Sequence, residues 1–230
     1  MASLLFRFFL TLECSIHSSM HEFFEDLKDS IFGNERQGDM SQFADRLGLT
    51  YQKKRGVKDL AFELLDMKIF KGSKRKTIRH FCTQKLPSID GSLQLFDYQY
   101  YPDSGKKQTT ILIFESSSFD FPTFTLRPKG TFEKLGGLLR RSKREFYHTP
   151  GFNKEFVLMS SAKDLVKPYF QKDLLELLLT LNHLTIEGKG PYLMIYEKYK
   201  MQPIDKLLPF YEDALEIAEL MYREPPSEFV

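Results

Sequence analysis

The feature that most limits the folds open to this chain is a central series of short segments rich in β-branched and aromatic residues. They cover Thr77 to Lys85, Leu93 to Tyr101, Gln108 to Ser116 and Thr123 to Arg127. The stretches "PSIDGS" and "PDSGK" between them supply Pro, Asp and Gly, the residues that chain reversals favour. Parallel strands need long crossover connections, and these gaps are short. The pattern therefore predicts an antiparallel β-meander.

Further strands and several helices surround this centre. "LTYQKKRG" predicts a short strand, "EFVLMS" another, and "LTIEGKGPYLMIYE" a hairpin that turns around Gly188 to Pro191. Helical spacing is found at Met40 to Leu47, Lys58 to Met67, Thr131 to Arg140, Phe170 to Leu181 and Pro209 to Tyr222. Ser161 and Asp164 have the spacing of a capping box. We expect an α+β fold: a mainly antiparallel sheet, with a meander and a C-terminal hairpin, packed with helices.

The length of 230 residues suits one large domain with an extension. We predict an N-terminal helical extension and linker at 1–38 and a single α+β domain at 39–230. Apolar residues near the start follow helical spacing, but their run is about half of the ~20 residues that a membrane span needs. We expect no transmembrane segment. Peripheral membrane contact through residues 1–19 is one interpretation, and a true start at Met20 is another.

Charge and cysteine content constrain location and partners only broadly. The net charge of +2 gives no overall attraction to nucleic acid, so nucleic acid is not the expected partner. Cys14 and Cys82 are far apart and too few for a disulfide scaffold, which favours a reducing compartment. The expected location is cytoplasmic, with attachment at the membrane periphery as the alternative.

Sequence templates for catalysis and cofactor binding are missing. The chain has no phosphate-binding loop, no Gly-x-Gly-x-x-Gly turn and no Gly-x-Ser-x-Gly elbow. His17 and His21 stand four residues apart, but no third metal ligand is near them in sequence. We therefore predict no catalytic, cofactor-binding or metal-binding residues, and no cofactor.

Basic residues gather in "QKKR", "KGSKRKTIRH" and "RRSKR". Brought together, they could neutralise several phosphates. Equally, lysines on loops and edge strands serve to keep sheets from associating. The residues of a possible anion-binding site are Lys74, Arg75, Lys76, Arg140, Arg141, Lys143 and Arg144.

One carboxylate stands out in the strand "LQLFDYQYYP". Alternation places Asp97 on the face of Leu93 and Leu95, where an ionised group is costly unless it is paired. A reversal near Ser104 and Gly105 would set Asp97 opposite Leu112 and Leu95 opposite Phe114. Arg79 on the preceding strand is the first expected partner, and a structural role is favoured. A hydrolase that combines Asp97 with His80 or His148 is the enzymatic alternative.

The order of several short motifs resembles a group of uncharacterised bacterial proteins with a domain of unknown function. The motifs are an F-D-Y-x-Y strand, the segment "FPTFTLRPKG", an F-N-x-x-F motif and a leucine-rich helix followed by a strand pair, spanning roughly Lys71 to Tyr222. Some members carry N-terminal membrane helices, and the group implies no activity. Asp97, Phe152, Asn153, Phe156 and Asp164 match the pattern as residues of unknown role. Asn153 and Asp164 also suit a turn residue and a helix cap.

These observations favour a non-catalytic intracellular domain that binds a partner protein or a small ligand, at the periphery of a membrane in one version. The alternatives are a hydrolase-type enzyme with dispersed Asp and His residues, and a polyanion binder for nucleic acid or phospholipid headgroups. No feature of the sequence identifies the partner or ligand.

Overall fold

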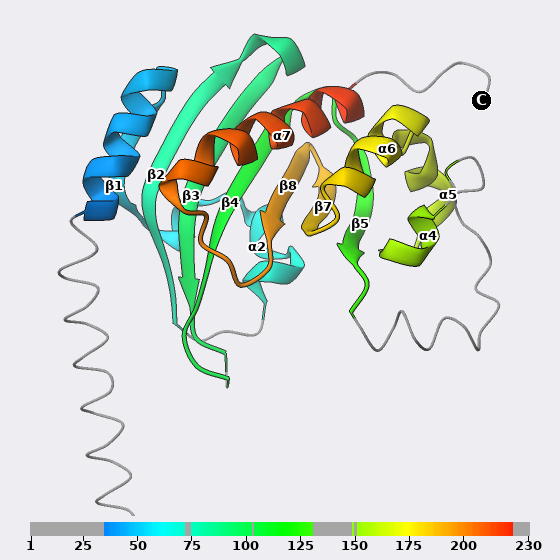
Figure 1. Cartoon of the computed structure of the whole chain (residues 1–230), viewed down its shortest axis with the longest axis horizontal. Coiled ribbons are helices and arrows are strands. Elements are labelled where there is room, and N and C mark those ends of the chain that lie inside the picture. Colours follow the sequence, from blue (N-terminus) through cyan, green and yellow to red (C-terminus); the bar gives the residue numbers. More distant parts are fainter. Residues whose placement is uncertain (1–34, 72–74, 103, 131–148, 150, 223–230) are drawn as a thin grey trace, which may run out of the picture. The chain divides into compact units, whose positions relative to one another are not determined.

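The computed structural model describes residues 35–71, 75–102, 104–130, 149 and 151–222 (Figure 1). The chain divides into two compact units, Met1–Phe43 and Ala44–Val230. Residues 35–47 are helical, so the predicted helix at Met40 to Leu47 exists and begins earlier, and Gly48 follows it at a φ of +67°. The predicted extension before residue 35, with its amphipathic helix and the alternative start at Met20, lies outside the described residues. The boundary at residues 38 and 39 stays a prediction.

The second unit is built on an eight-stranded antiparallel sheet with the order β1-β2-β3-β4-β8-β7-β5-β6. The fold is therefore α+β, as predicted. The strands are β1 (Thr50–Arg55), β2 (Lys76–Leu86), β3 (Gly91–Tyr100), β4 (Lys107–Ser116), β5 (Phe121–Pro128), β6 (Phe156–Ser160), β7 (Leu184–Gly190) and β8 (Tyr192–Glu197).

Strand order confirms the meander in part. β2, β3 and β4 follow one another, and β7 and β8 form the expected hairpin at Pro191. The predicted fourth strand of the meander, β5, does not pair with β4, because the β7–β8 hairpin lies between them. Gly188 of β7 allows the Phe124 ring of β5 to lie across it, since a Cβ at Gly188 would stand 2.1 Å from Phe124 Cε1.

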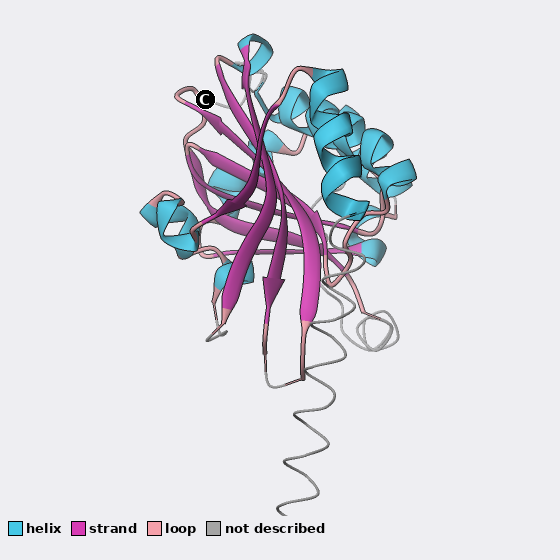
Figure 2. Ribbon diagram, turned by 90° about the vertical axis from the view of Figure 1, so that its left-hand side faces the viewer, coloured by secondary structure: helices cyan, strands magenta, loops and turns pink. Residues whose placement is uncertain are grey.

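The two faces of the sheet differ, and Figure 2 shows the main group of helices on one side only. The face that we call the α7 face carries Leu95, Leu112, Ile195, Ile186 and Leu126, which stand opposite one another across the paired strands. α7 (Ile204–Tyr222) lies over this face and buries Leu207, Phe210 and Ala214 among others. Four further helices follow β5 in the chain, α4 (Phe152–Glu155), α5 (Lys163–Val166), η4 (Lys167–Tyr169) and α6 (Lys172–Thr180), and η3 (Pro87–Ile89) lies between β2 and β3.

The opposite face, which we call the η2 face, is covered across β2, β3, β4 and β8 by three short elements. They are η1 (Val57–Asp59), α2 (Phe62–Leu65) and η2 (Lys68–Phe70). Their apolar residues pack with Phe96, Tyr98 and Ile111 of the sheet in one buried cluster. The single helix predicted for Lys58 to Met67 is therefore wrong. Leu64, Met67 and Phe70 are buried at intervals of three, which suits 3₁₀ turns better than a continuous α-helix.

Two helix ends also differ from prediction. α7 begins at Ile204, so Pro209 lies inside it and does not open it. The helix thus begins more than one turn before the predicted start, and Leu207 in this added part is buried. α5 follows Ala162 without a side-chain cap, so the Ser161–Asp164 capping box is not formed, and Asp164 pairs with Lys167 at 2.9 Å. The helix predicted for Thr131 to Arg140 lies outside the described residues.

Candidate functional site

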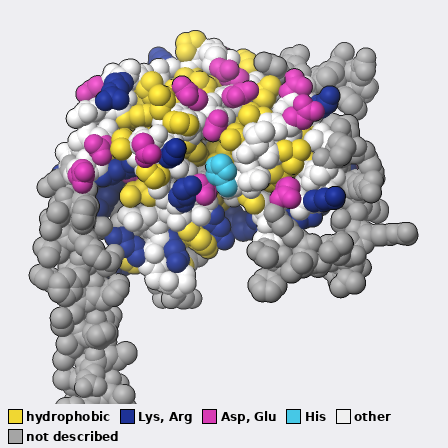
Figure 3. All heavy atoms as spheres, in the orientation of Figure 1, with side chains coloured by type: hydrophobic (Ala, Val, Ile, Leu, Met, Phe, Trp, Pro, Cys, Tyr) yellow, Lys and Arg dark blue, Asp and Glu magenta, His cyan; other side chains and the backbone are white. Residues whose placement is uncertain are grey.

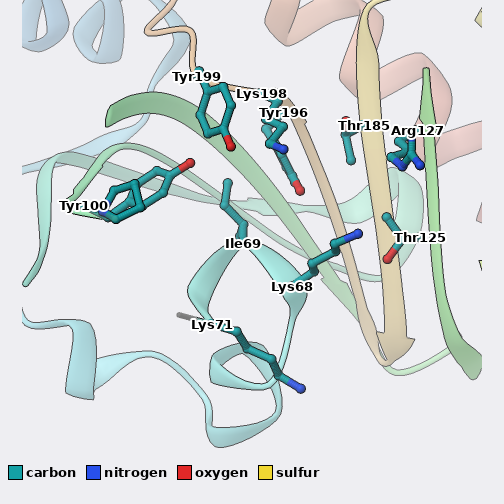
Figure 4. A pocket seen from close by; sticks show the side chains of 11 residues that line it. Lys68, Ile69, Lys71, Tyr100, Thr125, Arg127, Thr185, Tyr196, Lys198 and Tyr199 are labelled. Carbon is teal, nitrogen blue, oxygen red and sulfur yellow. The ribbon is translucent and has the colours of Figure 1, made fainter. Parts of the chain in front are cut away.

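A cavity of about 200 Å³ opens on the η2 face, where η2 meets strands β5, β7 and β8 (Figure 4). Its lining combines basic, aromatic and hydroxyl side chains from five separate parts of the chain. The lining residues are Lys68, Ile69, Lys71, Tyr100, Pro102, Thr125, Arg127, Thr185, Tyr196, Lys198 and Tyr199. None of these residues is Asp or Glu.

Strand alternation explains why polar groups line the cavity. In β5, Phe124 and Leu126 are buried toward the α7 face, so Thr125 and Arg127 point to the η2 face. In β7 the same alternation sends Leu184 and Ile186 one way and Thr185 the other. The cover from η1, α2 and η2 packs on β2, β3, β4 and β8, and the polar positions of β5 and β7 lie at its edge. The edge of that cover forms one wall of the cavity.

A buried carboxylate fixes this wall. Glu187 of β7 is 3% exposed and lies next to the cavity on the η2 face. Its Oε2 accepts a hydrogen bond from the Lys68 backbone N–H at 2.6 Å, and its Oε1 accepts one from the Tyr196 hydroxyl at 2.6 Å. Burial raises the pKa of Glu187 above its ordinary value, against the lowering effect of these hydrogen bonds. One carboxylate thus holds two residues that line the cavity.

Two further tyrosines, Tyr100 and Tyr199, line the cavity. The ring centroids of Tyr100 and Tyr199 lie 6.5 Å apart, and the ends that carry their hydroxyl groups approach each other in Figure 4. Tyr199 has a φ of +64°, which is rare for a residue other than glycine, and its N–H donates to Thr109 Oγ1 at 3.2 Å. Burial raises the pKa of Tyr100 to about 12, so its hydroxyl stays protonated at neutral pH.

The charges around the cavity favour an anion. Lys68, Lys71, Arg127 and Lys198 line it, although Lys71 points away from the others (Figure 4). The neighbouring carboxylates are engaged elsewhere: Asp66 pairs with Lys189 at 3.0 Å, and Glu197 pairs with Lys200 at 2.6 Å. By contrast, α7 carries five acidic residues and one lysine, and acidic side chains are scattered over that side of the molecule in Figure 3.

Asp97 lies on the other side of the sheet, on the α7 face. It is 5% exposed and accepts a hydrogen bond from Thr110 Oγ1 at 2.7 Å. The predicted register was wrong by two residues: Asp97 stands opposite Thr110, and Leu95 stands opposite Leu112. The chain reversal between β3 and β4 is centred one residue earlier than expected. The resulting shift of two residues leaves every side chain on its predicted face of the sheet. Arg79 does stand directly opposite Asp97 on β2, as expected.

The residues of the enzymatic alternative are placed in part. His80 is buried at a bulge in β2 with a φ of +53°, and its Nδ1 lies 3.0 Å from the Tyr51 hydroxyl. Burial raises the pKa of Tyr51, and the nearby Cys82 and Asp97 add to this effect, so Asp97 and His80 share Tyr51 as a neighbour. His148 lies outside the described residues. The hydrolase hypothesis stays untested.

The predicted anion site cannot be assembled from the described residues. Lys74, Arg140, Arg141, Lys143 and Arg144 lie outside them. The Arg75 guanidinium stands 4.8 Å from the centre of the Tyr101 ring, and Lys76 Nζ donates to the carbonyl of Phe70. Lys71, at the start of the same basic stretch, does line the cavity. Asn153 lies in α4, not in a turn, and its carbonyl accepts a hydrogen bond from Lys129 Nζ at 2.5 Å.

Sequence reasoning missed Lys68, Arg127, Glu187 and Lys198. One signal was present: Thr185 and Glu187 alternate with apolar residues in a strand that is buried along most of its length. Polar side chains at alternate positions of a buried strand indicate that one face of the strand borders water or a ligand. Locating such a site also requires knowing which strands pair with it.

No helix in the described part of the chain is long and apolar enough to cross a membrane. Within those same residues, no three His, Cys, Asp or Glu side chains are placed to share a metal ion. The predictions made for residues 1–19 are not addressed by either observation.

No family model matches this chain, and no curated protein matches its sequence. The resemblance to a bacterial group therefore stays an expectation. Among solved structures, the chain is similar to the crystal structure of the mycobacterial trehalose monomycolate transport factor A, TtfA, with a TM-score of 0.54 and 9% identity. The similarity covers 81% of this chain and 92% of that chain. At 9% identity, this similarity shows a shared fold.

Proposed function

We propose that this chain is a non-catalytic domain that binds the headgroup of a lipid in the cavity on the η2 face and acts at a membrane surface. The observation that carries the proposal is the cavity itself. It brings together basic and aromatic side chains from η2, β3, β5, β8 and the loop after β8. Concave sites with a few convergent polar groups are where proteins hold small ligands.

The size of the cavity supports a headgroup. Its volume of about 200 Å³ is below the roughly 300–1,000 Å³ of pockets that enclose drug-sized ligands. A compact polar group fits, and the bulk of a lipid would remain outside. A site of this kind acts best where the lipid stays partly in its membrane, which agrees with peripheral attachment.

The shared fold adds independent support. The similar structure belongs to a protein whose name describes transport of trehalose monomycolate. If fold and role go together here, the chain handles a lipid rather than modifies it. A protein partner remains the alternative within the same non-catalytic class.

A pair of matched substitutions tests the proposal. Thr125 and Thr123 lie on β5 two residues apart, and only Thr125 lines the cavity. A phenylalanine is well tolerated on a strand, so Thr125→Phe fills the cavity while Thr123→Phe adds the same ring outside it. We would incubate each full-length variant with dihexanoyl phosphatidylglycerol and dihexanoyl phosphatidylcholine and record native mass spectra.

We expect a one-to-one lipid adduct on the parent chain and on Thr123→Phe, and its loss from Thr125→Phe. Equal adducts on both variants would show that lipid binds elsewhere. The absence of any adduct on the parent chain would overturn the proposal and direct the search to a protein partner.

A further inference from the structure

We infer that the group recognised in this cavity is an anion, such as a phosphate, sulfate or carboxylate, and not a neutral sugar or polyol. This inference rests on the proposed function, because it names the chemical class of the ligand for the same site. Three features of the described residues support it: the balance of donors and acceptors, the engagement of nearby carboxylates, and the placement of the tyrosines.

The lining is rich in hydrogen-bond donors and poor in acceptors. Lysine and arginine donate hydrogen bonds and cannot accept them. Lys68, Arg127 and Lys198 contribute such groups, and the lining contains no Asp, Glu, Asn or Gln side chain. A sugar hydroxyl donates as well as accepts, so it needs acceptors that this lining offers only through hydroxyl groups and the backbone. Arg127 Nη1 already donates to the Pro128 carbonyl at 3.1 Å, and an anion can accept from the ammonium groups of Lys68 and Lys198. Hydrogen bonds to charged groups are the stronger ones.

The oxygens of the nearby carboxylates are occupied by other groups, although the charge of Glu187 still acts on Lys68. Both Glu187 oxygens accept hydrogen bonds, one from the Lys68 backbone and one from Tyr196. Glu197 lies 2.6 Å from Lys200 Nζ. Among the described residues, no carboxylate forms an ion pair with the ammonium group of Lys68 or Lys198. Their N–H groups can therefore donate to a ligand, with the Lys198 ammonium already placed over the Tyr199 ring.

The tyrosines favour a ligand that extends beyond its anionic group. Tyr199 is 51% exposed at the rim, and the Lys198 ammonium lies 4.5 Å from the centre of its ring. The protonated Tyr100 hydroxyl adds a neutral donor below it. An anion held between Lys68 and Lys198 would leave its uncharged part against the exposed Tyr199 ring, where apolar contact is available.

Calorimetric titration of the full-length chain at fixed ionic strength tests the inference. The probes are inorganic phosphate, glycerol 1-phosphate, glycerol and trehalose, so that charge and hydroxyl content vary separately. The variants are Lys68→Gln and Arg127→Gln, and the control is Lys53→Gln, which removes the same charge from exposed β1 at the far edge of the sheet. We expect the two phosphates to bind, with affinity lowered at least about tenfold by each cavity variant and unchanged by the control.

The remaining measurements separate the sources of the anion. Tighter binding to phosphatidylglycerol vesicles than to glycerol 1-phosphate would identify a lipid headgroup, and equal affinity would identify a free phosphorylated compound. Both results support an anion site. Trehalose or glycerol binding as tightly as the phosphates, or equal losses in Lys53→Gln and Lys68→Gln, would overturn the inference. If Thr125→Phe still abolished the binding of a neutral probe, the cavity would keep its proposed function with a different ligand.

Discussion

Two buried carboxylates on opposite faces of the sheet hold distant segments in place, and their surroundings differ. On the α7 face, Asp97 accepts a hydrogen bond from Thr110 Oγ1, and that same oxygen accepts the Gln202 backbone N–H at 2.9 Å. The loop between β8 and α7 is fixed in this way. On the η2 face, Glu187 fixes the start of η2 through the Lys68 N–H. Each carboxylate joins a strand to a segment far away in the sequence.

The difference lies in what the fixed segment borders. Asp97 acts through Thr110 on Gln202, at the end of the loop that leads into α7. Lys198 and Tyr199, at the start of this loop, line the cavity and take no part in these hydrogen bonds. The segment held by Glu187 forms a wall of a cavity, and its second partner, Tyr196, lines the same cavity. Burial alone therefore does not distinguish a structural acid from one that shapes a binding site. The neighbouring cavity does.

The largest effect is expected from Glu187→Leu. This change leaves the Lys68 N–H and the Tyr196 hydroxyl without their acceptor, and each buried donor left unpaired costs about 1–3 kcal/mol. We expect the free energy of unfolding to fall by about 2–4 kcal/mol in urea titration. Glu187→Gln keeps one acceptor oxygen and should lose about half as much. Phosphate affinity should follow the same order, because the cavity wall depends on this contact.

Equal stability of the leucine and glutamine variants would show that the two hydrogen bonds do not hold η2. Unchanged phosphate affinity in a folded leucine variant would separate the carboxylate from the site.

Asp97 should affect stability without affecting ligand binding. Asp97→Asn, Thr110→Val and the double variant form a double-mutant cycle around the 2.7 Å hydrogen bond. Hydrogen bonds to charged groups contribute about 1.5–3 kcal/mol, so we expect a coupling energy of about 2 kcal/mol in urea unfolding. Phosphate affinity should stay that of the parent chain in Asp97→Asn, because the Tyr199 N–H is held separately by Thr109 Oγ1. A loss of affinity in Asp97→Asn would show that the two faces are coupled.

The pH dependence of stability should single out Glu187. Burial raises its pKa above the ordinary value of 4.5, so the native state holds this proton more tightly than the unfolded state does. The stability that comes from this group is complete below the unfolded pKa and is lost as the pH rises through the folded pKa. We expect the stability of the parent chain relative to Glu187→Gln to fall as the pH rises above the ordinary value of 4.5 and through the raised folded pKa, in urea titrations. A relative stability that rises with pH would show that hydrogen bonding outweighs burial at this carboxylate.

Much of the fold could be predicted from local patterns, and the sheet order could not. Alternation located β2, β3, β4 and β5, and the Gly–Pro turn located the β7–β8 hairpin. Nothing local says that this hairpin inserts beside β4, because that pairing joins residues some eighty positions apart, as with Phe114 and Leu193. The register of β3 and β4 was off by two for a related reason. A shift of two residues leaves every side chain on the same face, so the apolar pattern fits both alignments.

The site was less predictable than the fold. Asp97 could be recognised from sequence because it alternates with leucines in its own strand. Thr125 and Arg127 have the pattern of ordinary solvent-facing strand residues, and only the positions of β7 and η2 beside them reveal the cavity. Lys198 and Tyr199 come from the loop after β8, and Lys68 from a 3₁₀ turn that local spacing assigned to a helix. The basic clusters that attracted notice are dense in sequence. The basic residues of the cavity come from separate elements of the fold, so no cluster along the sequence marks them.

The smallest effect is expected from Asp66→Asn, which removes the ion pair between Asp66 at the end of α2 and Lys189 of β7. This pair joins the same two regions as the Glu187–Lys68 hydrogen bond, so it is the obvious rival as an anchor for η2. The Asp66 side chain is 54% exposed, however, and exposed pairs of long side chains are screened by water and salt. We expect the urea midpoint and the phosphate affinity of Asp66→Asn to equal those of the parent chain within error, at low and at high salt. A loss of stability close to that of Glu187→Leu, and greatest at low salt, would show that the surface ion pair holds this wall and the buried carboxylate does not.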